Sequence, residues 1–394
     1  MSPAASTDAA ASILTTLRNG VASVTLNRPA SLNALSYGMV QDLQQQLRSF
    51  ARDGGVKAVL LRGAGGRAFC AGGDVRALYD SRQSAASAHE AFFVAEYELD
   101  YLLHRYPKPT VALADGIAMG GGMGLVQGSR LRIVGEGTRM AMPEVAIGLF
   151  PDVGGSYFLS RLPGALGAYL ALTGTPIRAA DALYATLADY YLTPAQSAGL
   201  EAALASLVWS DDVLATLRAA IRELAGTANA PLAPARPATP GVAAPGTHTP
   251  GAPLAALRAA IDLHFSRRRV AEILDSLQRE TRIEYAEWAA QTLQTLRSRS
   301  PTMLCVSLRQ LQRGRTLSLA DCFRMELGMV RQCFVQGDFI EGIRALIIDK
   351  DGAPHWQPDR IEAVSAADVE AFFEEHWAGA AHPLANLEGL ANLG

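Results

Sequence analysis

The sequence predicts an α/β domain followed by a mostly helical region. Short buried strands alternate with helices in the first part of the chain, an order typical of α/β domains. The composition changes sharply near Ala228, and helical patterns then cover Leu254–Arg299 and Thr302–Val335. We therefore divide the chain into a core of residues 1–227, a Pro/Ala-rich linker or insertion of residues 228–253, and a helical C-terminal region of residues 254–394.

The first predicted elements are a β-hairpin and a helix. Asn19-Gly20 is a favoured two-residue turn between Ile13–Leu17 and Val21–Leu26. Ser36 can then cap a helix that runs to about Asp53, because its hydroxyl can accept a hydrogen bond from a free backbone N–H. One face of that helix is apolar and consists of Met39, Val40, Leu43, Leu47 and Phe50.

The rest of the α/β domain alternates in the same way. We predict a strand at Val56–Arg62, a glycine-rich loop at Gly63–Asp74, a helix at Ala85–Tyr106, a strand at Thr110–Ala114, a glycine-rich turn opening into a short helix at Gly116–Arg130, and strands at Leu131–Val134 and Thr138–Ala141. Residues 228–253 contain almost no large apolar side chain, so burial cannot offset the entropy of ordering them.

The composition excludes several classes of protein. The 394 residues are 49% hydrophobic and 19% charged, with a net charge of −3, which does not suit binding to nucleic acid or to an anionic membrane. No apolar run is long enough to span a bilayer. No basic residue precedes Arg18, which argues against a secretory signal or an Arg-rich transit peptide. We expect a cytoplasmic protein with no nucleic-acid or membrane partner.

The cysteines and histidines indicate neither disulfides nor a metal. Cys70, Cys305, Cys322 and Cys333 are too few and too scattered for a disulfide scaffold or a zinc site, so we expect free thiols. The seven histidines show no HxxxH spacing, and we expect no metal-dependent chemistry.

Two carboxylates stand out in the apolar stretch MPEVAIGLFPDVGG, which begins at Met142. Glu144 and Asp152 could point to solvent from turns, where an acid after proline often meets free N–H groups. They could instead converge on a dry pocket and perform acid–base work. The stretch alone leaves both readings open.

Three glycine-rich loops could bind a ligand. Gly63–Ala68 matches the G-x-G-x-x-A dinucleotide fingerprint, but the residues after it do not begin a helix, which that site requires. Cys70–Asp74 and Met119–Gly124 could each present a backbone N–H, and two such groups would form an oxyanion hole. Tight turns and close packing would explain the same glycines.

The order of four motifs suggests a family. NRPASLNAL (from Asn27), RAFCAGGDV (from Arg67), ADGIAMGGGMGL (from Ala114) and AMPEVAIGLFPDVGG (from Ala141) together resemble the enoyl-CoA hydratase/isomerase (crotonase) superfamily over about Ile13–Ala225. FPDVGG, SPTMLCVSLRQL and GDFIEGIRALIIDKDGAPHWQP look most like its 3-hydroxyisobutyryl-CoA hydrolase family. The resemblance implies a crotonase-like spiral of ββα repeats and a coenzyme A thioester substrate.

The resemblance also implies roles for individual residues. The N–H groups of Gly73 and Gly121 would form the oxyanion hole, and Glu144 would attack the thioester or activate the water that does. Asp152 would position substrate or water and assist proton transfer. Glu96 would contact substrate, although an exposed helix carboxylate is an equal alternative.

The second carboxylate favours hydrolysis over hydration. Hydratases of the superfamily carry a second glutamate where this chain has Gly124, and glycine cannot transfer a proton. The expected reaction is hydrolysis of 3-hydroxyisobutyryl-CoA in valine breakdown. The alternatives are an enoyl-CoA hydratase or isomerase of fatty-acid oxidation and a non-catalytic acyl-CoA-binding protein. A Ser-His-Asp thioesterase would need a G-x-S-x-G elbow, which the chain lacks.

The expected partner is an acyl-CoA, so coenzyme A is part of the substrate and no separate cofactor is expected. Arg28, Arg67, Arg76 and the run His264–Val270 are candidates for contacts with its phosphates, or are plain surface charges and helix caps. The resemblance allows a homo-oligomer. The preferred acyl group stays open.

Overall fold

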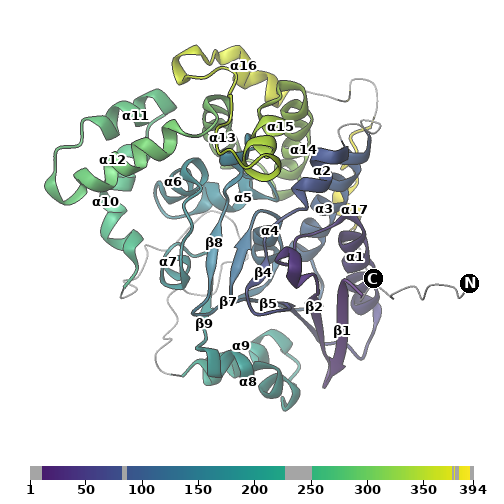
Figure 1. Cartoon of the computed structure of the whole chain (residues 1–394). Helices are drawn as coiled ribbons and strands as arrows, with labels where there is room; N and C mark the ends of the chain where they lie inside the picture. Colours follow the sequence, from purple (N-terminus) through teal and green to yellow (C-terminus); the bar gives the residue numbers. More distant parts are fainter. Residues whose placement is uncertain (1–10, 82–86, 227–250, 375–376, 378–380, 391–394) are drawn as a thin grey trace, which may run out of the picture.

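Two sheets form the centre of the computed structural model, which describes residues 11–81, 87–226, 251–374, 377 and 381–390 (Figure 1). The larger sheet has the order β1-β2-β3-β5-β7-β9 and the smaller one β4-β6-β8. Only β1 and β2 pair antiparallel; the other pairs are parallel. The strands are β1 Ile13–Arg18, β2 Val21–Leu26, β3 Ala58–Gly63, β4 Ala68–Cys70, β5 Thr110–Ala114, β6 Ile117–Met119, β7 Leu131–Val134, β8 Arg139–Ala141 and β9 Tyr190–Tyr191.

The chain winds between the two sheets as a spiral. Each of three successive turns places one strand in the larger sheet and the next in the smaller sheet, in the pairs β3 and β4, β5 and β6, and β7 and β8. A helical segment follows each pair, so the repeat is ββα. The predicted crotonase-like spiral is therefore confirmed.

Nine helices accompany this spiral in its described part. They are α1 Tyr37–Arg52, α2 Val75–Ser81, α3 Ser87–His104, α4 Gly121–Gly128, α5 Gly155–Phe158, α6 Leu166–Thr173, α7 Ala179–Tyr184, α8 Pro194–Ala205 and α9 Val213–Ala225. Short 3₁₀ turns are η1 Pro29–Ser31, η2 Glu144–Ile147 and η3 Leu159–Arg161. In Figure 1, α8 and α9 lie below the sheets, on the side away from the C-terminal helices.

The structure confirms the predictions that rest on strong local sequence signals. Asn19 and Gly20 have φ angles of 47° and 76°, and Arg18 pairs with Val21, as a tight hairpin requires. Ser36 accepts a hydrogen bond from the Met39 N–H and begins α1. The strands β4 and β6 lie inside segments predicted as glycine-rich loop and turn. That prediction was wrong because three-residue strands are too short to show a period of two.

The C-terminal region is helical, as predicted. Its helices are α10 Pro253–Phe265, α11 Val270–Gln278, α12 Ile283–Arg297, α13 Pro301–Gly314, α14 Leu319–Gln336, α15 Asp338–Ile343, α16 Ala366–Glu370 and α17 Leu387–Leu390, with the π-helical turn η5 Arg344–Ile348 and the 3₁₀ turns η6 Ile361–Ala363 and η7 Ala371–Phe373. The predicted helical stretch Thr302–Val335 is two helices, because Ser318 caps a new one by accepting from the Asp321 N–H.

The C-terminal helices share a hydrophobic core with the spiral. Helix α14 packs on α3 and α5, and α13 packs on α5 and α6. Phe323 of α14 packs against Tyr97 of α3, with ring centroids 5.6 Å apart and the rings tilted by 46°. Most of the predicted linker 228–253 lies outside the described residues, so the three-part division stays a prediction. None of the described helices has the length and hydropathy that a membrane crossing requires.

Candidate active site

Two glycine turns meet at the start of α4. The Leu35 N–H donates to the Gly72 carbonyl at 2.8 Å, and the Asp74 N–H donates to the Leu35 carbonyl at 2.9 Å, which fixes the turn that contains Gly73. A Cβ at Gly72 would lie 3.5 Å from the Gly121 nitrogen. Gly121 is the first residue of α4, so its N–H has no intrahelical acceptor. The two residues of the predicted oxyanion hole therefore lie in adjoining turns.

Glu96 of α3 lies against both turns. Its side chain is 2% exposed, because α3 is covered by α1, α4 and α14. A Cβ at Gly73 would lie 3.9 Å from Glu96 Oε1, and a Cβ at Gly121 would overlap that oxygen. Position 121 must therefore stay glycine while Glu96 keeps this place. The alternative of an exposed helix carboxylate at Glu96 is wrong.

Glu144 approaches the same turns from another element. It begins η2 directly after Pro143, and its side chain is 5% exposed. A Cβ at Gly120 would lie 3.0 Å from Glu144 Oε1. Glu144 Oε2 and Glu96 Oε1 are buried and have no hydrogen-bond partner among the described residues. One oxygen of each carboxyl group therefore has no partner within the described part of the protein.

Asp152 lies in a strained turn that faces α3. Its side chain is 4% exposed, and the Tyr97 hydroxyl donates to its Oδ2 at 2.9 Å. Val153 has a φ of 51°, a left-handed conformation that costs a β-branched residue about 1–3 kcal/mol. Gly154 follows with a φ of 83° and is the N-cap residue of α5. Asp152 is therefore buried by a strained backbone turn, which persists only if contacts with the surrounding protein stabilise it.

Burial dominates the electrostatics of these carboxyl groups. It raises the pKa of Asp152 to about 7, against the opposing hydrogen bond from Tyr97. Burial, and then the charge of Asp152, raise the pKa of Glu144 and of Glu96 well above the usual range. The negative charge of Asp152 therefore disfavours ionisation of both glutamates.

Asp100 was missed by sequence reasoning. It lies one helical turn after Glu96, is 0% exposed, and neither of its carboxyl oxygens has a hydrogen-bond partner among the described residues. A Cβ at Gly124 would lie 2.6 and 2.7 Å from those oxygens. The absence of a side chain at Gly124 therefore makes room for a carboxyl from α3. The i,i+4 spacing from Glu96 was the one available signal.

Glu326 was also missed. It lies on α14, is 0% exposed, and accepts hydrogen bonds from the Gly154 N–H and the Ser156 N–H, both at 2.8 Å. Burial raises its pKa to about 8, opposed by these same hydrogen bonds. No local signal could have found it, because 172 residues separate it from Gly154.

Within the described residues, no three His, Cys, Asp or Glu side chains are arranged to hold a metal ion.

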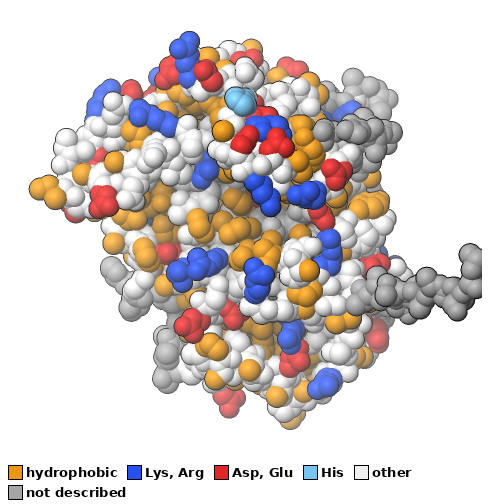
Figure 2. Space-filling view, viewed as in Figure 1, with side chains coloured by type: hydrophobic (Ala, Val, Ile, Leu, Met, Phe, Trp, Pro, Cys, Tyr) orange, Lys and Arg blue, Asp and Glu red, His pale blue; other side chains and the backbone are white. Residues whose placement is uncertain are grey.

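The basic candidates have separate roles. Arg28 donates to the Ala34 carbonyl at 2.6 Å and to Asp74 Oδ2 at 3.1 Å, so it ties two loops of the site together. Arg67 and Arg76 are exposed, and Arg76 also donates to the Ile347 carbonyl at 3.1 Å. Figure 2 shows hydrophobic side chains across the middle of one face, with Lys and Arg side chains around them.

His264 belongs to the core rather than to a phosphate site. It is 1% exposed, and its two ring nitrogens lie 2.8 Å from Ser276 Oγ and from Glu280 Oε2. Arg282 also binds Glu280, at 2.5 Å. His264 is therefore not exposed for a phosphate contact, whereas the arginines at positions 267–269 of the same run are exposed.

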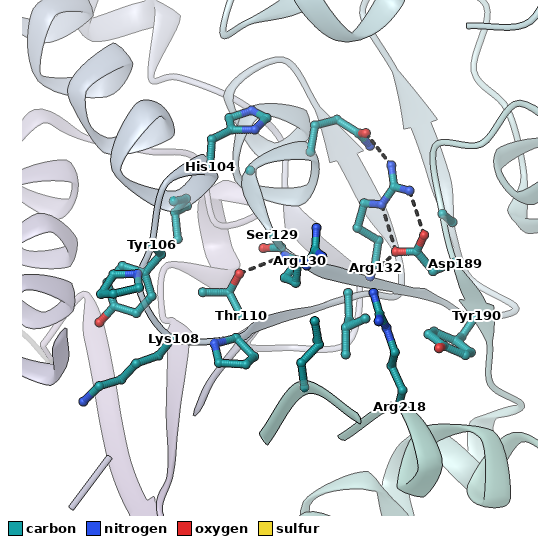
Figure 3. Close-up of a pocket in the computed structure, with 18 of the residues that line it drawn as sticks. His104, Tyr106, Lys108, Thr110, Ser129, Arg130, Arg132, Asp189, Tyr190 and Arg218 are labelled. Carbon is teal, nitrogen blue, oxygen red and sulfur yellow. Dashed lines mark hydrogen bonds and ion pairs between the residues drawn. The ribbon is translucent and has the colours of Figure 1, made fainter. Parts of the chain in front are cut away.

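A cavity of about 370 Å³ lies at the opposite end of α4 (Figure 3). Gly128 and Ser129 line it, which places it about 10 Å from Gly121 at a rise of 1.5 Å per residue. Arg132 lines the cavity and forms an ion pair with Asp189, also in the lining, at 2.8 Å. None of the buried carboxyl residues described above lines this cavity, so it is separate from the candidate site.

Comparisons with known proteins agree with this geometry. Residues 21–373 match the family described as Enoyl-CoA hydratase/isomerase. The chain is 39% identical to "3-hydroxyisobutyryl-CoA hydrolase 1" of Arabidopsis thaliana, over 92% of this chain and 91% of that protein. It is 37% identical to "3-hydroxyisobutyryl-CoA hydrolase, mitochondrial" of Gallus gallus, over 93% and 90%.

Solved structures share the fold over nearly the whole chain. A carnitinyl-CoA dehydratase from Mycobacterium thermoresistibile matches with a TM-score of 0.79 and 36% identity, over 92% of this chain and 96% of that one. An enoyl-CoA hydratase from Rhodobacter sphaeroides 2.4.1 matches with a TM-score of 0.76 and 34% identity, over 93% and 98%. The spiral, the paired glycine turns and the family match lead to one conclusion: the chain belongs to the enoyl-CoA hydratase/isomerase family.

Proposed function

We propose that the protein hydrolyses an acyl-CoA thioester, with 3-hydroxyisobutyryl-CoA as the substrate and 3-hydroxyisobutyrate and coenzyme A as products. The observation that carries this proposal is the approach of Glu144 to the turn at Gly120–Gly121, together with its electrostatic coupling to Asp152. The relatives named as 3-hydroxyisobutyryl-CoA hydrolases support the choice of substrate.

The thioester carbonyl would bind between the two glycine turns. In that pose the N–H groups of Gly73 and Gly121 donate to the carbonyl oxygen and stabilise the negative charge that develops on it. One donor of this kind contributes about 3 kcal/mol to lowering the barrier. Glu96, packed beside both glycines, would contact the bound acyl group.

Asp152 would assist proton transfer, and the reaction would be opened by Glu144 in its ionised form. In one route its carboxylate removes a proton from water as the water oxygen bonds to the carbonyl carbon. In the other route the carboxylate itself bonds to that carbon and water later cleaves the anhydride. In both routes the carbon–sulfur bond breaks and the departing thiolate takes a proton, which protonated Asp152 can supply.

Release of free thiol from a panel of acyl-CoAs, measured beside hydration of crotonyl-CoA, tests the proposal. We expect thiol release to be fastest with 3-hydroxyisobutyryl-CoA, and Glu144→Gln to reduce it strongly while the exposed Glu136→Gln leaves it unchanged. Fast hydration without thiol release by the wild-type protein would refute the proposal. Label from heavy-oxygen water in the Glu144 carboxylate would favour the covalent route.

Hydration is disfavoured by the surroundings of Gly124. The hydratase alternative needs a second carboxylate from that position, and the Asp100 carboxyl occupies the space where its Cβ would lie. The solved structures named as hydratase and dehydratase share the fold, and a fold alone does not determine the reaction.

We further propose that this reaction serves valine breakdown in a reducing cytoplasm. All four cysteines are free, and Cys70, Cys322 and Cys333 are buried, which suits such a compartment. A homo-oligomer remains part of the proposal, and light scattering on the purified protein would test it. Cell fractionation would test the location.

A further inference from the structure

Two C-terminal helices hold the turn that contains Asp152. Gln310 of α13 is fully buried, and its side-chain N–H group donates to the Pro151 carbonyl at 2.6 Å and to Ser156 Oγ at 2.8 Å. Glu326 of α14 accepts from the N–H groups of Gly154 and Ser156. The turn is therefore fixed on both sides of Asp152 by residues from outside the spiral.

The contact with Glu326 falls on the strained part of the turn. Val153 and Gly154 have φ angles of 51° and 83°, and Glu326 binds the N–H that directly follows Val153. A strained backbone persists only where its surroundings determine it. Each of the two Glu326 carboxyl oxygens accepts from one of the two N–H groups. An ionised carboxylate suits this arrangement because both of its oxygens are strong acceptors, whereas the protonated oxygen of a neutral carboxyl is a weaker acceptor.

Glu326 shares a buried electrostatic environment with the site. The ionisable groups that act on it or respond to it are Asp152, Asp100, Tyr97 and Cys322. The charge of Asp152 disfavours ionisation of Glu326, and the charge of Glu326 disfavours ionisation of the other three groups. The Arg161 guanidinium acts in the opposite direction on Cys322. Burial thus has the larger effect on the pKa of Glu326, and the charge of Asp152 raises that pKa further.

We propose that Glu326 is a positioning residue for hydrolysis: from α14 it fixes the conformation of the turn that carries Asp152, the residue that the proposed reaction uses for proton transfer. This inference rests on the proposed function. It gives the helical C-terminal region a direct role in the chemistry of the spiral, through a contact that spans 172 residues of sequence.

Glu326→Gln tests this role, because glutamine keeps the shape but leaves one N–H without an acceptor and removes the charge. We expect kcat for thiol release to fall about 10- to 100-fold, as for a reacting group displaced by about 1 Å, with KM changed less than about threefold. Wild-type kcat/KM should rise with pH in two steps, near 7 and near 8, and the variant should lose the upper step. Glu326→Asp keeps the charge and should retain two steps at reduced kcat.

Glu280→Gln is the matched control. Glu280 is a buried carboxylate of the same helical region with a side chain 4% exposed, and it contacts His264 and Arg282 rather than the Asp152 turn. We expect this control to lower the urea midpoint with kcat unchanged. Folded Glu326→Gln with wild-type kcat and both pH steps would overturn the inference, and so would equal kcat losses in Glu280→Gln and Glu326→Gln. Absence of thiol release by the wild-type protein would instead refute the proposed function.

Discussion

Gly124→Ala should destabilise the fold because the added Cβ would overlap the Asp100 carboxyl group. The added Cβ would lie 2.6, 2.7 and 2.8 Å from Oδ2, Oδ1 and Cγ of Asp100, all far inside ordinary contact distance. Both residues are buried on packed helices, α4 and α3, so neither side can move freely. Overpacking of this kind costs about 1–3 kcal/mol.

Removing Asp100 should reverse the sign of that effect. In Asp100→Ala the space beside position 124 is open, and alanine then replaces glycine in a helix with a gain of about 0.5–1 kcal/mol. The difference between the two backgrounds predicts a coupling free energy of about 1.5–4 kcal/mol. The coupling is large because the Asp100 carboxyl group supplies the three atoms nearest to the added Cβ.

A double-mutant cycle of urea unfolding free energies measures this coupling. Gly38→Ala serves as the control, since no atom lies within 4 Å of its Cβ position on α1, and its effect should be equal in both backgrounds. If the effects of Gly124→Ala and Asp100→Ala add to within about 0.5 kcal/mol, the steric account of Gly124 is wrong.

Three further predictions follow from the same coordinates. Gly121→Ala should lower kcat for thiol release by about 100-fold, because its Cβ would displace Glu96 and disturb the N–H of the oxyanion hole; unchanged kinetics would remove this residue from the site. The free energy of unfolding should fall as pH rises from about 4 to about 8. Asp152 and Glu326 have pKa values of about 7 and about 8 in the folded protein, above their values near 4 in the unfolded chain. Over this range the native state therefore binds more protons than the unfolded state, and stability is lost as they dissociate. Urea midpoints at pH 5 and pH 8 measure this fall, which should be smaller in Asp152→Asn. Asp189→Ala should destabilise the protein by about 3 kcal/mol, because it leaves Arg132, with a side chain 6% exposed, without its ion-pair partner; a calorimetric Tm equal to that of the wild type would contradict this.

The sequence by itself determined the elements whose causes are local. The Asn19-Gly20 turn, the Ser36 cap and the apolar face of α1 depend on neighbouring residues, so they could be read directly. The glycine motifs and the Glu144/Asp152 stretch pointed to the spiral and to the candidate site only through their resemblance to a known family. The short strands β4 and β6 could not be read, because they form only by pairing with each other and with β8.

Tertiary structure alone decided what surrounds the two carboxylates. Asp100 fills the space beside Gly124, Tyr97 binds Asp152, and Glu326 holds the turn from a helix far along the chain. Whether Glu96 and Glu144 face water or protein also depends on which helices cover them. The physical reason is that desolvation and long-range hydrogen bonds arise only when distant segments pack together, and no local pattern encodes them.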